Sequence, residues 1–382
     1  ARLRAAAAGL LVATMLAGCG VDVPAPGLVE TPARDAQGKA AGARGGAAAS
    51  GGEGHAPRPT ATRPAPLPSP FPAPGQVFLG VTTPEGPYDL RQVDDFGSAV
   101  GQQPDVLLYA AGWAHDRFRA DLLEDVRGKG LLPMVGWEPW DYRAPGDAAY
   151  NHGDQPKYAL RRILAGEFDA YIDEWARGAA AFGSPMAIRF AHEMNGDWYP
   201  WAESVNGNSP GEYVKVWRYV HDRFTAAGAD NVLWVWSPNR EYETSQALAE
   251  LYPGDEYVDW VGVVGYYGAA GTQLSAPSFD DVFGQTLSAL RRVSSRPVVI
   301  TETGGTQRYG RKTQWVREFF AGLKRHPEII GFVWFEIDKE ADWRVTSSPA
   351  PRRAFAEAMR DPRYGAALDP RYGAAPSSRP AP

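Results

Sequence analysis

The sequence contains almost no cysteine, and this scarcity excludes a fold held together by disulfide bonds. Its single cysteine, Cys19, has no second cysteine in the chain to pair with. Histidine is scarce too, with six residues in 382, and no closely spaced pair of histidine or cysteine residues suggests a zinc motif. No cofactor fingerprint occurs either. The sequence therefore predicts an activity that needs no metal and no cofactor.

An excess of positive charge is also lacking. The formal net charge is -6, whereas a protein that binds nucleic acid normally carries a basic surface. Tryptophan is absent from the start of the chain, because all 13 tryptophans lie at or after Trp113. Most of them are expected in the core, but tryptophans near strand ends can stack on sugar rings. We therefore expect no nucleic-acid partner.

The N-terminus carries a pattern typical of a secretory signal. Arg2 and Arg4 precede an apolar stretch, Ala5–Ala17, that is too short to span a bilayer comfortably. The stretch ends in Leu16-Ala17-Gly18-Cys19, which resembles the lipobox of bacterial lipoproteins. That resemblance implies a cleaved signal peptide at 1–18, a diacylated Cys19 and anchoring to the outer face of the cell membrane. The alternative is an ordinary signal peptide with an incidental cysteine.

Two segments have no pattern that could bury a core. Residues 19–75 are rich in Ala, Gly, Pro and Ser, and six prolines alternate with other residues between Pro64 and Pro74. This composition predicts a disordered or polyproline-like linker. At the other end, residues 361–382 read as a tail in which the heptapeptide DPRYGAA occurs twice, at 361–367 and 369–375. We assign no function to this repeat.

Between these segments, residues 76–360 alternate regularly between short apolar runs and amphipathic stretches. Near-continuous apolar runs of strand length are typical of parallel strands buried on both faces. Eight strand–helix repeats in one domain predict an α/β fold of the (β/α)8 TIM-barrel type. A doubly wound open sheet is the alternative, but the first run is not followed by a glycine-rich phosphate loop. The predicted strands are Val77–Thr82, Asp105–Ala110, Leu131–Gly136, Met186–Ala191, Asn231–Trp236, Val258–Val264, Pro297–Glu302 and Ile329–Phe335.

Two glutamates end the fourth and seventh runs, where a barrel of this type carries out its chemistry. Strand alternation would place Glu193 on one face with Arg189 and Ala191, and Glu302 on one face with Val298 and Ile300. If both faces point inward, the two carboxyl groups meet over the barrel axis. Glycoside hydrolysis needs such a pair, one as acid and one as nucleophile or base.

The segment around Glu193, IRFAHEMNGDWYPW, resembles the signature of glycoside hydrolase family 26, whose best-known members are β-mannanases. The resemblance extends through WEPW (137–140), VWSPN (235–239), DWVGVVGYYG (259–268), ITETG (300–304) and WFEIDKEADWRV (334–345). It implies a retaining mechanism, with Glu193 as acid/base and Glu302 as nucleophile. Retention corresponds to carboxyl groups about 5–5.5 Å apart. One departure is Tyr267, where the family often has Asn, and this bears on substrate preference.

The resemblance also implies substrate-binding residues. It matches His192 to a substrate-binding histidine, Trp198 to an aromatic residue beside the cleavage site, and Tyr266 to a tyrosine that hydrogen-bonds the nucleophile. Trp334 matches the tryptophan platform beneath the sugar. Arg189 either orients a carboxylate or neutralises buried charge, and Trp137 either binds sugar or packs at the barrel rim.

For the acid, we expect Trp198 and the second carboxylate to raise the pKa of Glu193. For the nucleophile, we expect Tyr266 and Arg189 to supply hydrogen-bond donors. The predicted function is endo-hydrolysis of a β-linked polysaccharide by a monomer, with β-1,4-mannan favoured. The alternatives are β-1,3-xylan, mixed-linkage glucan or the cell's own exopolysaccharide, and a non-catalytic polysaccharide-binding surface lipoprotein.

Overall fold

A computed structural model describes residues 71–144, 154–269, 277–308 and 310–365 of the chain. The predicted signal peptide, Cys19, most of the predicted linker and the second DPRYGAA copy lie outside these residues. None of the helices described within these ranges has the length and apolar character needed to cross a bilayer.

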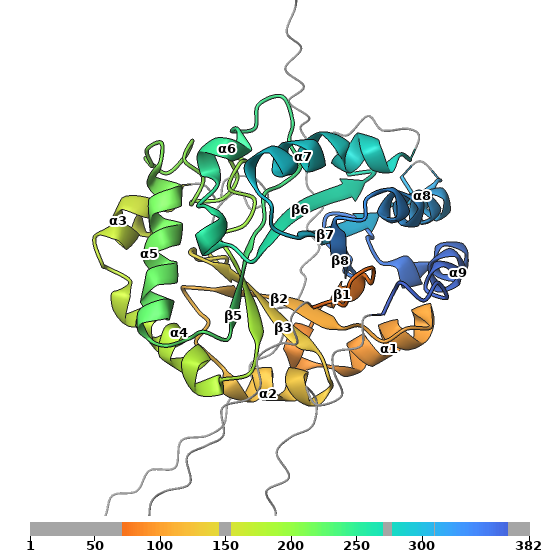
Figure 1. Cartoon of the computed structure of the whole chain (residues 1–382), viewed down its shortest axis with the longest axis horizontal. Helices are drawn as coiled ribbons and strands as arrows, with labels where there is room; N and C mark the ends of the chain where they lie inside the picture. The colour runs from red at the N-terminus through yellow and green to blue at the C-terminus, as the bar shows by residue number, and fades with distance from the viewer. Residues whose placement is uncertain (1–70, 145–153, 270–276, 309, 366–382) are drawn as a thin grey trace, which may run out of the picture. The chain divides into compact units, whose positions relative to one another are not determined.

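Eight parallel strands close into a barrel in chain order, with β1 hydrogen-bonded to both β2 and β8 (Figure 1). This confirms the predicted TIM barrel, and each strand begins and ends within three residues of its predicted limits. The strands are β1 (Phe78–Thr82), β2 (Val106–Gly112), β3 (Leu132–Glu138), β4 (Met186–Phe190), β5 (Val232–Trp236), β6 (Trp260–Tyr267), β7 (Val298–Gly305) and β8 (Ile329–Phe335).

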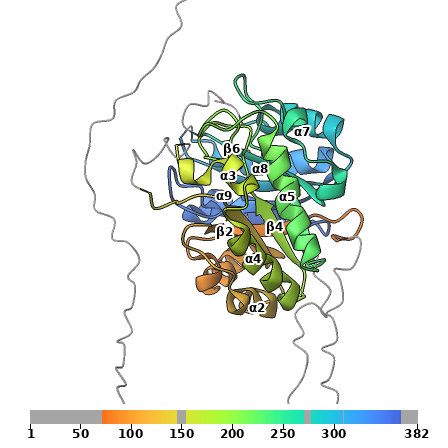
Figure 2. The same ribbon diagram turned by 90° about the vertical axis from the view of Figure 1, so that its left-hand side faces the viewer.

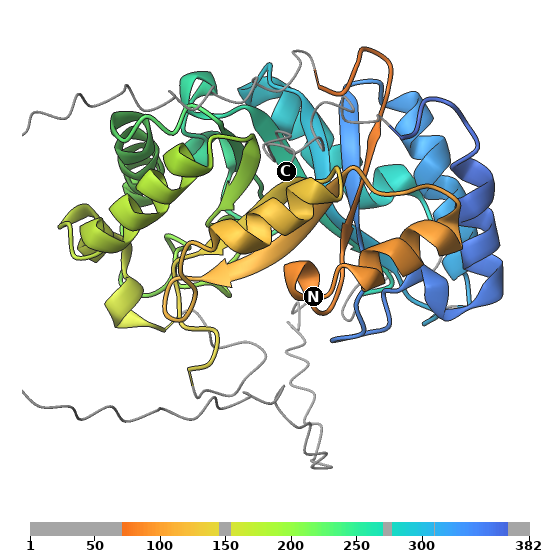
Figure 3. The same cartoon turned by 90° about the horizontal axis from the view of Figure 1, so that it is seen from below.

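Helices surround the strands, as the predicted repeats require (Figure 1). The pair α4 and α5 pack side by side (Figure 2), and α1 packs against α9 (Figure 3). The described helices are α1 (Arg91–Val100), α2 (Ala120–Gly128), α3 (Leu160–Leu164), α4 (Asp169–Phe182), α5 (Glu212–Ala226), α6 (Leu248–Leu251), α7 (Phe279–Val293), α8 (Lys312–Arg325) and α9 (Pro349–Ala358), with 3-10 turns η1 (Gly86–Tyr88), η2 (Pro156–Tyr158), η3 (Asp255–Tyr257) and η4 (Val345–Ser347).

The strands bury both of their faces, which explains why they read as continuous apolar runs. One set of side chains packs between the barrel and its helices, and it includes most of the buried tryptophans. A second set forms a separate cluster from alternate positions of the strands, inside the barrel. Its buried members are Phe78, Val106, Leu108, Leu132, Met134, Ala187, Val235, Trp260, Val299 and Val333.

The first DPRYGAA copy packs against the barrel beside the start of β1. The backbone N–H of Val77 donates to the carbonyl of Arg363 at 2.7 Å, and Gly365 N–H donates to the carbonyl of Val77 at 3.3 Å. Tyr364 between them is buried against Phe320. Residues 361–365 therefore extend the packed structure beyond the predicted end of the barrel at residue 360.

Candidate active site

Glu193 is positioned by an unusual backbone conformation after β4. The strand ends at Phe190, and Ala191 and Glu193 then adopt positive φ angles of 41° and 54°. Such angles are rare for residues other than glycine, and they concentrate at functional sites. The Glu193 N–H is fixed by the carbonyl of Ser237 at 2.8 Å. The expected alternation is therefore wrong at this point, because Ala191 joins the outer core while Arg189 reaches the centre of the barrel.

Glu302 is directed by an irregularity in β7. Val298 and Ile300 belong to the outer core and Val299 to the barrel interior, so simple alternation would turn Glu302 outward. In the pairing with β6, however, successive partners skip from Ile300 to Glu302 and leave Thr301 as an extra residue. A bulge of this kind redirects the side chains that follow it. The predicted shared face of Val298, Ile300 and Glu302 is corrected accordingly.

Both carboxylate oxygens of Glu302 accept hydrogen bonds. Arg189 Nη1 donates to Oε1 at 2.5 Å, and the Tyr266 hydroxyl donates to Oε2 at 2.6 Å. Arg189 is itself fixed through Nε, which donates to Ser237 Oγ at 2.9 Å. Burial and the charge of Glu302 hold the pKa of Tyr266 well above its usual value, so its hydroxyl remains a donor. The contacts predicted for Arg189 and Tyr266 are thus present.

Glu193 has a different environment. Its Oε2 accepts from Trp198 Nε1 at 2.8 Å, and its Oε1 accepts from Asn239 Nδ2 at 2.9 Å. Burial raises the pKa of Glu193 to about 7, and the negative charge of Glu302 acts in the same direction. Arg189 and the two N–H donors oppose this rise. The expectation that Trp198 raises the pKa of Glu193 is therefore corrected, since its hydrogen bond lowers it.

Two tryptophans expected to bind sugar lie elsewhere. Trp334 is fully buried in the outer core, where its ring centroid lies 5.2 Å from that of Phe355 on α9. Trp137 is also fully buried, with Trp113 and Trp175 at 4.9 and 5.1 Å. Both side chains point from their strands towards the helices. Neither can stack on a sugar ring, so both predicted binding roles are corrected.

His192 and Trp198 lie beside the carboxyl pair, as predicted. The His192 ring is buried, with its centroid 5.0 Å from that of Tyr199. Burial, assisted by the charge of Arg189, lowers the pKa of His192 well below its usual value, so the imidazole is neutral at neutral pH. Trp198 is half-buried and stacks on Tyr242 at 6.1 Å. This aromatic pair lies on one side of the Glu193 carboxyl group.

The structure adds site residues that were not selected from the sequence. Trp343, on the chain after β8, lies with its ring 4.6 Å from that of Tyr266. Asn239 contacts Glu193 directly, and Glu138 ends β3 close to His192. All three stand inside motifs noted above, so the signal was present. Strand alternation could have identified only Glu138, which points inward at the end of β3 where Trp137 points outward, because Asn239 and Trp343 lie in the segments after β5 and β8.

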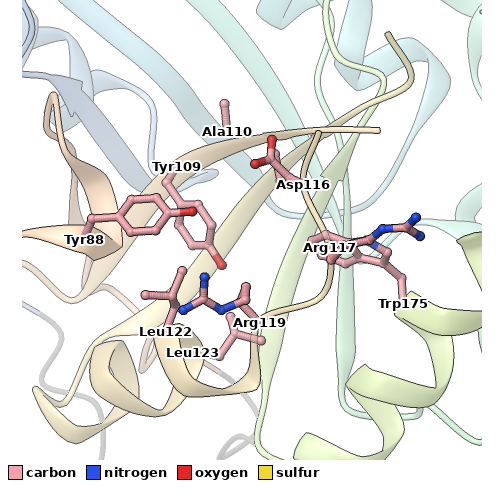
Figure 4. Close-up of a pocket in the computed structure, with 10 residues that line it drawn as sticks. Tyr88, Tyr109, Ala110, Asp116, Arg117, Arg119, Leu122, Leu123 and Trp175 are labelled. Carbon is pink, nitrogen blue, oxygen red and sulfur yellow. The ribbon is translucent and has the colours of Figure 1, made fainter. Parts of the chain in front are cut away.

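A separate pocket lies outside this carboxyl pair (Figure 4). Tyr88 of η1, Tyr109 of β2 and Arg119 line it, together with residues of α2 and α4. Neither Glu193 nor Glu302 lines it. Among the described residues, no group of three or more His, Cys, Asp or Glu side chains is arranged to hold a metal ion.

Comparison with known proteins shows which families and proteins this chain is similar to. The family model described as glycosyl hydrolase family 26 matches residues 144–300, which include Glu193. Endoglucanase H of Acetivibrio thermocellus is 32% identical over 276 residues, covering 70% of this chain and 29% of the relative. The mannan endo-1,4-beta-mannosidase of Bacillus subtilis (strain 168) is 28% identical, covering 57% and 62%. A beta-1,3-xylanase, TXYA of a Vibrio species, is 22% identical, covering 72% and 64%.

The chain thus spans less than two thirds of the length of each of these relatives. Among solved structures, a family 26 β-mannanase of Bacteroides ovatus superposes with a TM-score of 0.58 at 18% identity, covering 81% of this chain and 96% of that one. At this identity the likeness shows the fold. The matched family model and the relatives named above show that this chain is similar to glycosyl hydrolase family 26 over the segment that contains Glu193.

Proposed function

We propose that the protein is a retaining endo-glycoside hydrolase that cleaves a β-linked polysaccharide, with β-1,4-mannan favoured. The observation that carries this proposal is the pair of buried carboxyl groups with contrasting partners. Glu302 is bonded to a guanidinium and a phenol, whereas Glu193 is bonded only to neutral N–H groups and has its pKa raised to about 7. A retaining glycosidase needs one ionised and one protonated carboxyl group.

In the first step, a carboxylate oxygen of Glu302 attacks the anomeric carbon. The bond to the glycosidic oxygen breaks as Glu193 transfers its proton to that oxygen, and a glycosyl ester forms on Glu302. In the second step, Glu193, now ionised, takes a proton from water. The resulting nucleophile attacks the anomeric carbon and releases Glu302, so that Glu193 is protonated again.

The neighbouring side chains support these roles. Arg189 and Tyr266 each hold one oxygen of Glu302, which fixes the carboxylate in a single orientation before attack. Trp198 and Asn239 hold Glu193 in the same way. Trp343, only 5% exposed, packs on Tyr266 and so holds this donor in place beside the nucleophile.

The choice of polysaccharide is inferred from the relatives, whose names give mannan, β-1,3-xylan and glucan as substrates. A panel of β-mannan, β-1,3-xylan and mixed-linkage β-glucan separates these possibilities, with release of reducing ends as the measurement. We expect the highest rate on mannan. A rate on either other glycan above that on mannan would overturn this preference and leave the proposed reaction class intact.

Single-residue variants test the reaction itself. Glu302→Ala and Glu193→Ala should each lower polysaccharide cleavage by at least about a thousandfold, because each removes one of the two groups that make and break bonds. Glu124→Gln, on the exposed face of α2, serves as the matched control and should retain full activity. NMR of the first product should show the β anomer. Activity that survives in both alanine variants would refute the assignment.

We also propose that Cys19 carries the lipid anchor predicted from the lipobox-like segment. The support is the sequence pattern alone, because Cys19 lies outside the described residues. Expression of the full chain in a bacterium with radiolabelled palmitate should label the protein, and Cys19→Ser should abolish the label. An unlabelled wild-type chain would favour an ordinary signal peptide.

A further inference from the structure

The first DPRYGAA copy occupies a site at the amino-terminal end of the barrel. Tyr364 pairs in parallel with Val77, the residue before β1. The N–H of Val77 donates to the carbonyl of Arg363 at 2.7 Å, and the N–H of Gly365 donates to the carbonyl of Val77 at 3.3 Å. The proposed catalytic carboxyl groups lie towards the carboxyl ends of β4 and β7, so the two sites are at opposite ends of the parallel strands. The reaction above assigns no role to this one.

Side chains hold the first copy as well as its backbone. The Asp361 carboxylate forms an ion pair with Lys324 of α8 at 2.9 Å. Tyr364 is only 4% exposed, and its ring centroid lies 5.2 Å from that of Phe320, also on α8. A charged and an aromatic side chain of the copy therefore both have partners on the barrel. The residues that contact the copy, here called the tail site, are Val77, Phe320, Leu323, Lys324 and Phe332.

The second copy repeats the groups that these contacts use. Residues 369–373 read Asp-Pro-Arg-Tyr-Gly, as do residues 361–365. Gly365 has a φ of 83°, in the left-handed region that favours glycine, and the second copy has a glycine at the matching position. One contact depends on the place in the chain, because the N–H of Asp361 donates to the carbonyl of Ala358 at the end of α9. The sequence of the second copy is thus suited to the tail site, and the connection to α9 favours the first.

The connection between the copies is short enough for exchange within one chain. Asp369 follows Asp361 by eight residues, so the second copy can reach the tail site if residues 361–368 form a loop. A loop of this length is within the usual range for connections between elements, and its closure entropy grows only slowly with length. A segment tethered by so short a linker has an effective concentration on the order of millimolar. This favours the second copy of the same chain over that of another molecule.

We propose that the tail site is a peptide-binding site for the sequence Asp-Pro-Arg-Tyr-Gly, and that residues 369–373 of the same chain are its alternative occupant. When the first copy leaves the site, the second takes its place and restores the backbone pairing with Val77. The repeat therefore gives the start of β1 two segments that can cover it. The inference does not depend on the proposed hydrolase function, because none of its contacts involves the active site.

A zero-length cross-link reports which copy occupies the tail site. A carbodiimide joins an amine to a carboxylate in contact with it, with loss of water, and should link Lys324 to Asp361 in the wild-type full chain. Tyr364→Ala removes the buried ring of the first copy and leaves the second copy intact. In this variant the main link should move from Asp361 to Asp369. Tyr364→Phe, which keeps the ring, and Tyr372→Ala, which changes only the second copy, should both retain the link to Asp361. Mass spectrometry of the tryptic peptides distinguishes the two links.

The equilibrium constant for unfolding in urea gives a second measurement. Loss of the aromatic ring from both copies should raise this constant by about a hundredfold or more, because neither copy can then fill the site. Tyr372→Ala should change it by less than about twofold in the wild type, where the first copy occupies the site. In the Tyr364→Ala background the same substitution should raise it by at least about tenfold.

Two results would overturn the inference directly: a main link that stays at Asp361 in Tyr364→Ala, and equal unfolding constants for Tyr364→Ala and the double variant. Links between two molecules, or a stability of Tyr364→Ala that rises with protein concentration, would also overturn it, because the occupant would then come from a second copy of the chain. If the double variant does not fold, as judged by circular dichroism, the position of the link in Tyr364→Ala decides.

Discussion

Two chemically identical side chains, Glu193 and Glu302, have neighbours of opposite character. The guanidinium of Arg189 contacts Glu302, while Glu193 contacts an indole and a carboxamide. A formal positive charge favours an ionised carboxylate more strongly than neutral donors do. Burial then acts on Glu193 with less opposition and raises its pKa to about 7. The proposed roles of acid and nucleophile therefore follow from these contacts, because the two side chains themselves are the same.

Asn239 offers a direct test of the acid. Its Nδ2 donates to Glu193 at 2.9 Å and lowers the pKa of that carboxyl group. Asn239→Ala should therefore raise the pKa of Glu193, and the alkaline limb of the activity profile should move to higher pH because the acid keeps its proton longer. Asn239→Asp adds a negative charge and should move the limb further. A profile of kcat against pH measures both, and a limb that stays in place in both variants would contradict the assignment of Glu193 as the acid.

A variant of Tyr266 tests whether its hydrogen bond to Glu302 supports the nucleophile. Tyr266→Phe deletes the hydroxyl that donates to Glu302 at 2.6 Å. A hydrogen bond to a charged group contributes about 1.5–3 kcal/mol, so kcat/KM should fall roughly 10- to 150-fold. Tyr257→Phe is the matched control, because this tyrosine lies in η3, before the start of β6 and at the opposite end of that strand from Tyr266. Comparable losses in the two variants would argue against a specific contact with the nucleophile.

At the scale of elements, the strands were predictable from their apolar runs, whereas the direction of individual side chains was only partly so. Glu302 reaches the barrel mouth because of a bulge at Thr301, and Glu193 reaches it through two residues with positive φ. The residues at these two deviations are neither glycine nor proline, so the sequence does not mark them. The resemblance matched Trp334 to a sugar platform, although alternation with the inward-facing Val333 turns Trp334 towards the helices. Counting the alternation of side chains from Val333, which faces the barrel interior, would have excluded Trp334 as a sugar platform.

The segment after β8 is held in place by two buried charged residues. Glu336 accepts hydrogen bonds from the backbone N–H groups of Val345 and Thr346 at 2.8 and 3.1 Å. Lys312 of α8 donates to the carbonyl oxygens of Asp342 and Arg344 at 2.9 and 2.6 Å. These contacts lie on either side of Trp343 in the chain. They fix the segment that carries this ring to the active site.

Glu336→Ala should therefore affect stability and activity together. It leaves two backbone donors without their acceptor, which costs about 1–3 kcal/mol for each one that stays buried. Displacement of Trp343 should lower kcat more than it raises KM, because this buried ring packs on Tyr266, the donor that holds Glu302. Urea unfolding and steady-state kinetics measure the two effects. Glu357→Ala, at an exposed position of α9, should change the unfolding free energy by less than about 0.5 kcal/mol. A stable variant with unchanged kcat would refute the role assigned to this segment.

At the scale of the whole molecule, buried carboxyl groups couple folding to pH. Burial raises the pKa of Asp105, Glu138 and Glu193 to about 7 in each case. Asp105 lies next to the start of β2 and accepts from the backbone N–H of Leu79 at 3.0 Å. The two glutamates lie at the opposite, carboxyl-terminal ends of the strands. Both ends of the barrel therefore hold protons that the unfolded chain would release near its usual carboxyl pKa values.

The sign of the pH dependence follows from proton binding. Between the unfolded pKa values, 3.8 for Asp and 4.5 for Glu, and about 7, the native state binds more protons than the unfolded state. The contribution of these groups to stability is therefore complete below pH 4 and is lost as pH rises through 7, by up to about 1.4 kcal/mol per pH unit for each group. Asp105→Asn and Glu138→Gln should each make the decline in unfolding free energy between pH 5 and 8 shallower, while Glu124→Gln should leave it unchanged. Urea titrations across this range measure the slope, and equal slopes in all four proteins would mean that neither Asp105 nor Glu138 retains a proton in the native state.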